Sequence, residues 1–250
     1  MLSRILPDLE SEDVMTIGKT YVMSDIHGCW DKYKRILEKI KLGTDDRLFI
    51  LGDVIDRKEF GIELLLDIRS ASNITLLLGN HEAMAIPVLK SIRHIAPEEK
   101  CLDILQGDEL QAWKDWTNEG GFSTQKSFLL LSDDERTLII DYLESLPLYK
   151  ELVIDDKNFV LVHAGLHGFL EEKRLDEYTV NDLVWDRCDY DKVYFKDKYL
   201  VTGHTPTFII KGNNRDKIYR KNNHIAVDCG AVYGKCLACL CLDTMEEFYA

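Results

Sequence analysis

A long apolar segment is missing from this chain of 250 residues, and no stretch approaches the roughly 20 apolar residues that a membrane-spanning helix needs. The N-terminus also lacks the basic-then-apolar pattern of a secretion signal. Internal repeats, low-complexity segments and linkers are absent as well. Since 46% of the residues are hydrophobic and 30% are charged, the composition is that of an ordinary globular protein. We expect one sizeable folded domain that has no membrane as a partner.

Positive charge is scarce, because 31 Lys and Arg residues stand against 44 Asp and Glu residues, for a net charge of -13. Such a chain repels polyanions, so nucleic acid is not an expected partner. The overall charge does not describe a pocket, since bound divalent ions and arginines can make one site locally positive. Four acidic residues fall within residues 1–19, where we expect a short acidic N-terminal extension: Asp8, Glu10, Glu12 and Asp13.

Cysteine does not occur in a pattern that indicates disulfides or zinc. The seven cysteines are an odd number, and nothing points to secretion, so we expect a reducing, cytoplasmic location. Cys236, Cys239 and Cys241 lie close together, but they lack a second Cys or His pair at zinc-finger spacing. We interpret this stretch as a buried strand near the C-terminus.

Three short polar peptides carry much of the chemistry, and each follows an apolar run of strand character. They are residues 25–27 (DIH), 52–57 (GDVIDR) and 79–82 (GNHE). The stretches between them have helical periodicity, so the series predicts a β-α-β-α-β unit with a parallel sheet. Loops at the carboxyl ends of parallel strands meet in one crevice. The resulting mixture of oxygen and nitrogen donors suits a pair of divalent transition ions.

Two more predicted strands end in a histidine with a glycine close by. His163 follows the apolar run 159–162, and His204 follows the run 199–202. With His27 and His81, they make four histidines at strand ends, which indicates a two-metal phosphoesterase. The other three histidines lack this setting, and we treat them as ordinary residues: His94, His167 and His224.

The motifs together resemble the PPP-type metallophosphatases of the calcineurin-like superfamily. The resemblance favours the bacterial and phage branch, which contains lambda-phage-type protein phosphatases and symmetrical dinucleoside tetraphosphate hydrolases. It implies an α/β sandwich with two central mixed β-sheets flanked by helices, over residues 20–250, with the C-terminal antiparallel strands forming much of the second sheet. The matching elements, in order, are Asp25-x-His27-Gly28, Gly52-Asp53-x-x-Asp56-Arg57, Gly79-Asn80-His81-Glu82, His163-Ala164-Gly165, Trp185-x-Arg187, Gly203-His204-Thr205 and a closing segment, 227–234.

The resemblance also implies a metal centre. Two cations about 4 Å apart acidify a water molecule and neutralise phosphoryl oxygens, and a carboxylate must bridge them. Asp53 is the expected bridge. We expect two divalent ions, with manganese first and iron or zinc as alternatives. The implied ligands are Asp25, His27 and Asp53 for one ion, and Asp53, Asn80, His163 and His204 for the other.

The same resemblance implies the catalytic residues. His81 follows the ligand Asn80 and would donate a proton to the leaving-group oxygen. Asp56 would orient His81 and favour its charged form. Arg57 and Arg187 would clamp the phosphoryl oxygens, a bidentate geometry that lysine cannot copy, and Asn80 and His81 would also contact the phosphate. The alternative for Arg187 is a surface ion pair with a neighbouring aspartate. For Asp228 we expect that it supports a turn or a metal-binding histidine and does not bind metal itself.

Residues 83–147 have a helical texture and read as an insertion near the mouth of the site. Ser132 and Glu135 predict a capped start for a helix over 133–146. The segment Trp116-x-Asn118-x-Gly120-Gly121 allows two interpretations: it shapes the substrate cleft, or it is a helix–loop packing motif.

One departure from the family concerns Lys58, which stands where the family has glycine directly after the motif's arginine. Either lysine adopts a backbone angle at some cost that glycine adopts freely, or the loop bends differently and brings an ammonium near the substrate.

We expect a metal-dependent hydrolase of phosphomonoesters, in the first place phosphorylated Ser, Thr or Tyr of proteins or peptides. The acidic chain shows no obvious basic or aromatic surface for a nucleotide, which favours the phosphoprotein. The alternative is a symmetrical dinucleoside tetraphosphate hydrolase with the same core. A hypothesis of another class is a metal-binding interaction protein without catalysis, against which the intact His81, Asp56, Arg57 and Arg187 argue.

Overall fold

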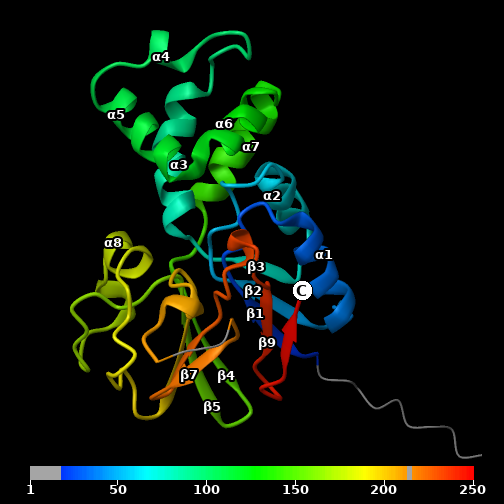
Figure 1. Cartoon of the computed structure of the whole chain (residues 1–250), viewed down its shortest axis with the longest axis vertical. Helices are drawn as coiled ribbons and strands as arrows, with labels where there is room; N and C mark the ends of the chain where they lie inside the picture. The colour runs from blue at the N-terminus through cyan, green and yellow to red at the C-terminus, as the bar shows by residue number, and fades with distance from the viewer. Residues whose placement is uncertain (1–17, 213–215) are drawn as a thin grey trace, which may run out of the picture.

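The computed structural model describes residues 18–212 and 216–250, so the expected acidic extension, 1–19, lies almost wholly outside the described residues. Two five-stranded sheets form the centre of the molecule (Figure 1). The first has the order β10-β9-β1-β2-β3, with β10 Glu247–Tyr249, β9 Ala238–Cys241, β1 Thr20–Met23, β2 Arg47–Ile50 and β3 Ile74–Leu76. The second has the order β4-β5-β6-β8-β7, with β4 Tyr149–Ile154, β5 Lys157–Val162, β6 Lys198–Thr202, β8 His224–Ala226 and β7 Tyr219–Lys221.

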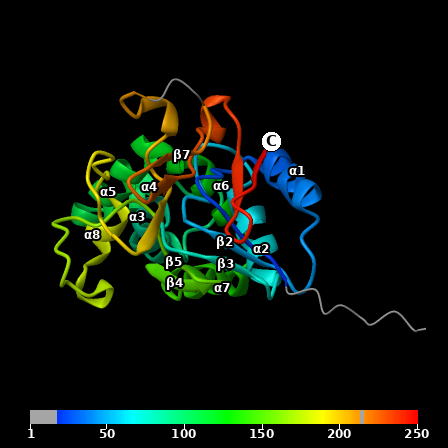
Figure 2. The same ribbon diagram turned by 90° about the horizontal axis from the view of Figure 1, so that it is seen from below.

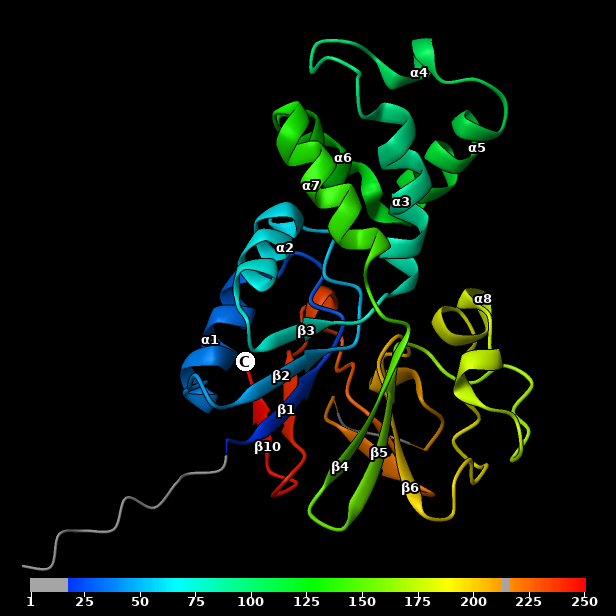
Figure 3. The ribbon, with the colours of Figure 1, turned by 180° about the vertical axis from the view of Figure 1, so that it is seen from behind.

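The predicted β-α-β-α-β unit is confirmed. Strands β1, β2 and β3 are parallel neighbours, and they are joined by α1 (Trp30–Ile40) and α2 (Gly61–Ser70). Both helices cover the outer face of the first sheet (Figure 3). The apolar side of α1 lies against the sheet, with Tyr33, Ile36 and Ile40 buried.

The strands alternate between two apolar layers, because successive side chains of a strand point to opposite faces. In β1, Tyr21 and Met23 join the core beneath α1 and α2, whereas Val22 joins the core between the two sheets. In β5, Leu161 also faces the other sheet. Val162 points outward to a third core that includes residues of α8, Val180–Val184. Figure 2 shows α1 and α8 on opposite sides of the sheets. The α/β sandwich expected from the resemblance is confirmed.

The C-terminal strands correct one expectation. β7 and β8 belong to the second sheet, but β9 and β10 join the first sheet, where β9 is antiparallel to β1. All four residues of β9 are buried. β9 pairs with the edge of β1 that lies opposite β2. Apolar layers lie on both sides of the sheet at this edge, so both faces of β9 are covered there.

The helical region between β3 and β4 forms a cap at one end of the sandwich (Figure 1). It contains α3 Asn80–Ile92, α4 Cys101–Ile104, α5 Gly107–Trp116, a π-helical turn at Thr117–Gly121, α6 Phe122–Leu129 and α7 Asp133–Glu144. Ser132 and Glu135 form the predicted reciprocal cap at the start of α7. Among the described residues, no helix is long and apolar enough to cross a membrane.

Candidate active site

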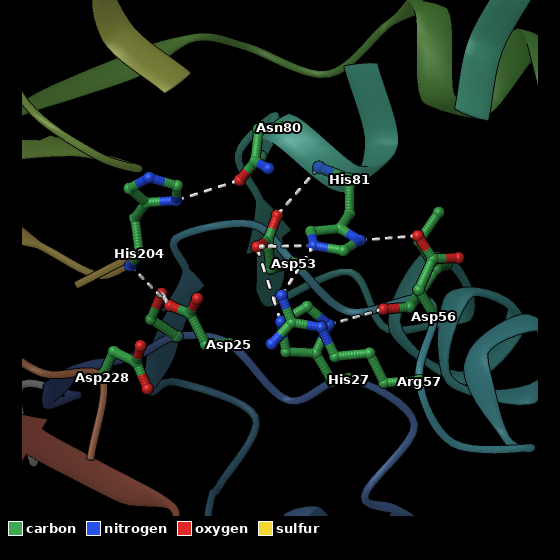
Figure 4. A network of polar contacts seen from close by, with 12 residues as sticks. Asp25, His27, Asp53, Asp56, Arg57, Asn80, His81, His204 and Asp228 are labelled. Carbon is green, nitrogen blue, oxygen red and sulfur yellow. Dashed lines mark hydrogen bonds and ion pairs between the residues drawn. The ribbon is translucent and has the colours of Figure 1, made fainter. Parts of the chain in front are cut away.

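The loops that follow β1, β2, β3 and β6 meet at one end of the two sheets, where they line a cavity of about 580 Å³. Figure 4 shows how the polar side chains from these loops converge. The cavity contains most of the site residues that the sequence predicts: Asp25, His27, Asp53, Arg57, Asn80, His81, Arg187 and His204. The other two lie behind its wall, since His163 and Asp56 are fully buried and contact Asn80 and His81.

The backbone of these loops is in an uncommon conformation. Six site residues have a positive φ between 45° and 73°, a left-handed region that costs free energy for residues other than glycine and is concentrated at functional sites. The surrounding structure must stabilise these turns, because isolated peptides would not adopt them. The six are Asp25, His27, Asp53, Asp56, Arg57 and His204.

Asp53 lies between two groups of histidines. Its Oδ2 is 3.6 Å from Nε2 of His27, and its Oδ1 is 3.5 Å from Nε2 of His163. Each carboxylate oxygen therefore faces a different imidazole, which is the arrangement required of a bridging ligand. Burial opposes the charge of Asp53, but the surrounding histidines hold the pKa of its carboxyl below the ordinary value.

The ring nitrogens on the second side of Asp53 indicate a cation. Nδ1 of His163 donates to the Leu51 carbonyl at 2.5 Å, which leaves Nε2 of the ring directed at the site. This Nε2 lies 2.9 Å from the amide oxygen of Asn80, and Nδ1 of His204 lies 3.0 Å from the same oxygen. Imidazole nitrogens and an amide oxygen are donor atoms for a divalent ion, and Asp53, His163 and His204 lie close enough together to hold one.

The first side has a similar donor set. Burial lowers the pKa of His27 to about 3, so the ring is neutral, and its Nδ1 donates to the Ile55 carbonyl at 2.8 Å. Asp25 accepts hydrogen bonds from the Ser24 hydroxyl and from the His204 backbone. Burial and the charge of Asp53 raise the pKa of Asp25 to about 6. A cation would relieve this repulsion between buried carboxylates, and two divalent ions fit the residues present.

His81 also lies within reach of the first group of donors, together with His27 and Asp53. Its Nδ1, however, is 2.6 Å from Oδ2 of Asp56. Burial opposes the charge of the His81 ring, but Asp53 and Asp56 outweigh it and raise the pKa of His81 to about 9. An imidazolium has no lone pair for a metal. This geometry supports the expected role of His81 as a proton donor rather than a ligand.

The two arginines differ in their surroundings. The guanidinium of Arg57 donates to the hydroxyl of Tyr233 at 2.7 Å, and its other terminal nitrogen is 3.1 Å from Nε2 of His81. Arg187 lines the same cavity and is exposed. Within residues 18–212 and 216–250 it forms no ion pair, whereas Asp186 pairs with His167. The alternative of an ion pair at Arg187 therefore has no support.

A protein-family model identifies the family of this chain. The model of the calcineurin-like phosphoesterase family matches residues 18–228, which is most of the chain. The chain belongs to this family.

Curated relatives of this calcineurin-like phosphoesterase include two that are named symmetrical bis(5'-nucleosyl)-tetraphosphatase. The one from Wigglesworthia glossinidia brevipalpis is 25% identical over 209 residues, which cover 81% of this chain and 61% of the relative. The one from Salmonella paratyphi C is 28% identical over 123 residues, which cover 48% of this chain and 41% of the relative. The aligned part thus spans less than two thirds of either relative.

A solved structure of a protein serine/threonine phosphatase from Saccharomyces cerevisiae is similar to this calcineurin-like phosphoesterase with a TM-score of 0.58. The match covers 91% of this chain and 73% of that one, at 16% identity. At this identity the similarity shows the fold alone.

The sequence analysis missed two residues that hold Asp56 in this calcineurin-like phosphoesterase. Nε1 of Trp116 donates to Oδ2 of Asp56 at 2.6 Å, and the hydroxyl of Thr124 donates to its Oδ1 at 2.6 Å. All three side chains are buried. Trp116 belongs to the segment for which two interpretations were open. Its own contacts fit the packing motif, since it is buried in the cap core, whereas Glu119 of the same segment lines the cavity.

Gly120 in the same segment explains how the cap contacts the loop of Arg57. Its carbonyl accepts a hydrogen bond from the backbone of Arg57 at 2.9 Å. Gly120 has a φ of 106°, and a Cβ there would lie 2.8 Å from Cγ of Arg57. Only glycine fits this position without strain.

Glu82 is a further residue that the sequence analysis did not assign. Its carboxylate is fully buried and accepts hydrogen bonds from the backbone N–H groups of Asp53 and Val54, both at 2.8 Å, and of Gly79 at 3.1 Å. It therefore ties the loop of Asp53 to the start of α3. The position of Glu82 next to His81 in the GNHE peptide was the one feature of the sequence that could have indicated its role.

Lys58 corrects another expectation. The left-handed residues of its loop are Asp56 and Arg57, and Lys58 is not among them, so the explanation by a strained lysine is wrong. Lys58 also does not line the catalytic cavity; it lines a neighbouring one. The second explanation placed the ammonium of Lys58 near the substrate, and the structure instead places Lys58 at the neighbouring cavity.

Asp228 and the remaining histidines lie where their side chains have other contacts. Oδ1 of Asp228 accepts a hydrogen bond from the backbone of Gly230 at 2.8 Å, which supports a turn beside the cavity. His94 and His167 are exposed. His224 is buried in the second sheet, where its Nε2 is 2.8 Å from the hydroxyl of Thr202.

The wall of the cavity contains aromatic side chains from three separate segments. Trp185 follows α8, and Phe208 and Tyr233 lie in the two 3-10 turns at Thr207–Ile209 and Ala231–Tyr233. Trp185 is 41% exposed and Tyr233 is 54% exposed, so their rings are available to a ligand. The sequence shows no obvious aromatic surface for a nucleotide, whereas the structure places these aromatic side chains on the cavity wall.

Proposed function

We propose that this calcineurin-like phosphoesterase hydrolyses a phosphate anhydride with two divalent ions, and that its substrate is a symmetrical dinucleoside tetraphosphate. The observation that carries the proposal is the aromatic wall next to the phosphate-binding arginines. A nucleotide needs a cationic site for its phosphates and a flat apolar surface for its base. The names of the curated relatives support the same substrate.

The residues of the chain have distinct tasks in this reaction. Arg57 and Arg187 bind the oxygens of the phosphoryl group that reacts, and Asn80 and His81 contact it from the start of α3. Asp56 holds the His81 ring through Nδ1 at 2.6 Å, so that its Nε2–H can donate to the leaving oxygen. When bound, the two ions would activate a water molecule and neutralise the phosphoryl oxygens.

The base of the nucleotide would stack on the aromatic wall. Trp185 and Arg187 come from the same loop after α8, so a base on Trp185 has its phosphates within reach of the arginine. Tyr233 is uncharged, but its hydroxyl accepts a hydrogen bond of 2.7 Å from the Arg57 guanidinium and thereby orients it. Stacking of a base on an aromatic side chain contributes about 1–3 kcal/mol.

A second candidate substrate is a phosphorylated serine or threonine of a protein. The observation that favours it is the buried His81–Asp56 pair, with the pKa of His81 raised to about 9. An alkoxide is a poor leaving group and needs a proton, whereas a nucleoside diphosphate leaves as a stabilised anion. A histidine that stays protonated at this position is therefore more useful for a phosphomonoester.

One assay separates the candidates. The purified protein is loaded with Mn²⁺, and its kcat/KM is measured with diadenosine tetraphosphate, a phosphoserine peptide and p-nitrophenyl phosphate. We expect diadenosine tetraphosphate to be the best substrate, with two molecules of ADP as the only products. ATP and AMP as products, or a preference for the peptide, would contradict the proposal. A protein that binds metal and hydrolyses none of the three would instead be an interaction protein.

We also propose that the protein works in the reducing environment of the cytoplasm. All seven cysteines lie in the described part of the chain and are free thiols. Reduced, unpaired cysteines are typical of cytosolic proteins. Labelling of the tagged protein in its native host would test the location, and a periplasmic or secreted pool would contradict it.

A further inference from the structure

A second cavity of about 550 Å³ adjoins the catalytic one, and Arg57 lines both. It lies between the start of α1 and the loop that leads to α2, and Trp30, Lys58 and Phe60 line it. A volume in this range is typical of sites for small ligands. None of the residues predicted to hold metal lines this second cavity.

The turn at Asp56 and Arg57 explains why the two cavities are adjacent. Both residues have a left-handed backbone, with φ of 73° and 68°, so the chain reverses sharply after Ile55. Arg57 directs its guanidinium to His81 and Tyr233 in the catalytic cavity. The residues that follow, from Lys58 to Phe60, line the second cavity.

Close packing of two loops keeps the second cavity beside the first. Gly28 has a φ of 69°, and a Cβ at this position would lie 2.8 Å from the backbone of Lys58. Its N–H donates to the Val54 carbonyl at 2.8 Å. The loop after β1 and the loop after β2 are therefore in direct contact, which limits independent movement of Lys58.

The second cavity has an aromatic surface. Phe60 is 47% exposed, and its ring centroid lies 6.4 Å from that of Trp30 at an angle of 41°. The ammonium of Lys34 lies 4.6 Å from the Trp30 ring and pairs with Asp67. Lys34 is thus engaged with Trp30 and Asp67, while Phe60 presents a large accessible apolar surface to a ligand.

One cationic side chain of the second cavity is free to meet an anion. Lys32, Arg57 and Lys58 line it, against the two carboxylates of Asp31 and Glu59. The ammonium of Lys32 donates to main-chain carbonyls. Within the part of the chain that the structure describes, Lys58 forms no ion pair, and its side chain is exposed. Lys58 is therefore available to neutralise a phosphate.

We propose that the second cavity binds the distal nucleoside of a dinucleoside polyphosphate. Phe60 and Trp30 stack its base, and Lys58 neutralises a phosphate on its side of the scissile bond. The inference rests on the proposed function and names the residues for the second half of that substrate. With the reacting phosphoryl group at Arg57, one nucleoside lies on the wall of Trp185 and Tyr233, and the other lies on Phe60.

The test compares two variants and two matched controls. Phe60→Ala removes the aromatic surface and Lys58→Ala removes the charge. Leu130→Ala and Lys126→Ala remove an exposed apolar and an exposed cationic side chain from α6 and its end, outside both cavities. KM is measured with diadenosine tetraphosphate, adenosine 5'-tetraphosphate and p-nitrophenyl phosphate.

The substrates distinguish the two contacts. Phe60→Ala should raise KM for diadenosine tetraphosphate by about tenfold, within the range for loss of one stacked base, and leave adenosine 5'-tetraphosphate unchanged, since that substrate has no second base. Lys58→Ala should raise KM for both polyphosphates, and the effect should shrink at high salt because exposed charges are screened. The controls should behave like the wild type.

Binding to the metal-free protein provides a readout without turnover. Calorimetric titration should show that diadenosine tetraphosphate binds more tightly than ADP, and that Phe60→Ala abolishes this difference. Unchanged KM and binding in both variants, or an equal effect on p-nitrophenyl phosphate, would overturn the subsite. A wild-type protein that binds diadenosine tetraphosphate in this way without hydrolysing it would overturn the proposed function and retain the subsite.

Discussion

Replacing His81 with Asn removes the expected proton donor and leaves a polar side chain of similar size. His81 is 1% exposed, and its side chain lines the cavity where the substrate would bind. A positioned general acid contributes about 10²–10⁴-fold to the rate, which corresponds to about 2.7–5.4 kcal/mol of barrier. We therefore expect kcat for a phosphoserine peptide to fall by about 10²–10⁴-fold.

The size of the fall in kcat for His81→Asn depends on the leaving group of the substrate. p-Nitrophenolate and a nucleoside diphosphate leave as stable anions that need little protonation, so their kcat should fall by about tenfold or less. The assay is kcat for the three substrates, together with the metal content of wild type and variant by mass spectrometry. Equal losses for aryl and alkyl phosphates would refute the acid role. Loss of one metal ion would show that His81 is a ligand instead.

The variant Asp56→Asn tests the other half of this reasoning. The charge and hydrogen bond of Asp56 contribute to raising the pKa of His81 to about 9. Without that charge, the pKa of His81 falls and the ring loses its proton at a lower pH. The basic limb of the kcat profile for the phosphopeptide should move to lower pH, by about 1 unit or more. An unchanged limb would show that Asp56 does not control the proton.

Three further predictions concern other parts of the molecule. Asp53→Asn should weaken both metal sites together, because its two oxygens face different histidines; a variant with two tightly bound ions and full turnover would contradict the bridge. Arg187→Ala should raise KM and lower kcat without changing the metal content, and Arg187→Lys should not restore activity, because a point charge lacks paired donors. Burial lowers the pKa of His224 to about 4, below its ordinary value of about 6.5, so its neutral form stabilises the fold fully above pH 6.5 and this stability is lost as the pH falls towards 4. The loss of unfolding free energy is about 3 kcal/mol, at 1.36 kcal/mol per pKa unit. Urea unfolding at pH 5 and 7.5 should show a smaller pH dependence of the unfolding free energy for His224→Gln than for the wild type. An equal dependence would refute the role of His224.

The strand-end peptides show which features of the site can be predicted from short stretches of sequence. Asp25, Asp53 and Asn80 follow three strands that are joined by helices, and the β-α-β connection rule places the ends of such strands at one edge of a sheet. The cap of α7 by Ser132 depends on residues three positions apart. Both features could be predicted because short-range backbone geometry determines them.

The supports of the site depend on contacts between distant segments. Asp56 is 60 residues from Trp116 and 68 residues from Thr124, and nothing in a single sequence shows that their side chains meet. The aromatic wall likewise combines side chains from three separate loops. Such pairings depend on how the cap and the second sheet pack against the first sheet.

The sequence by itself therefore determined the parallel sheet, the metal-type donors at its edge and the acidic character of the chain, because these follow from periodicity, composition and connection rules. Only the tertiary structure decided that β9 and β10 complete the first sheet, that the cap holds Asp56, and that Lys58 faces a second cavity. Those outcomes depend on burying the apolar faces of many elements at once. Their free energy belongs to the whole core and not to any one segment.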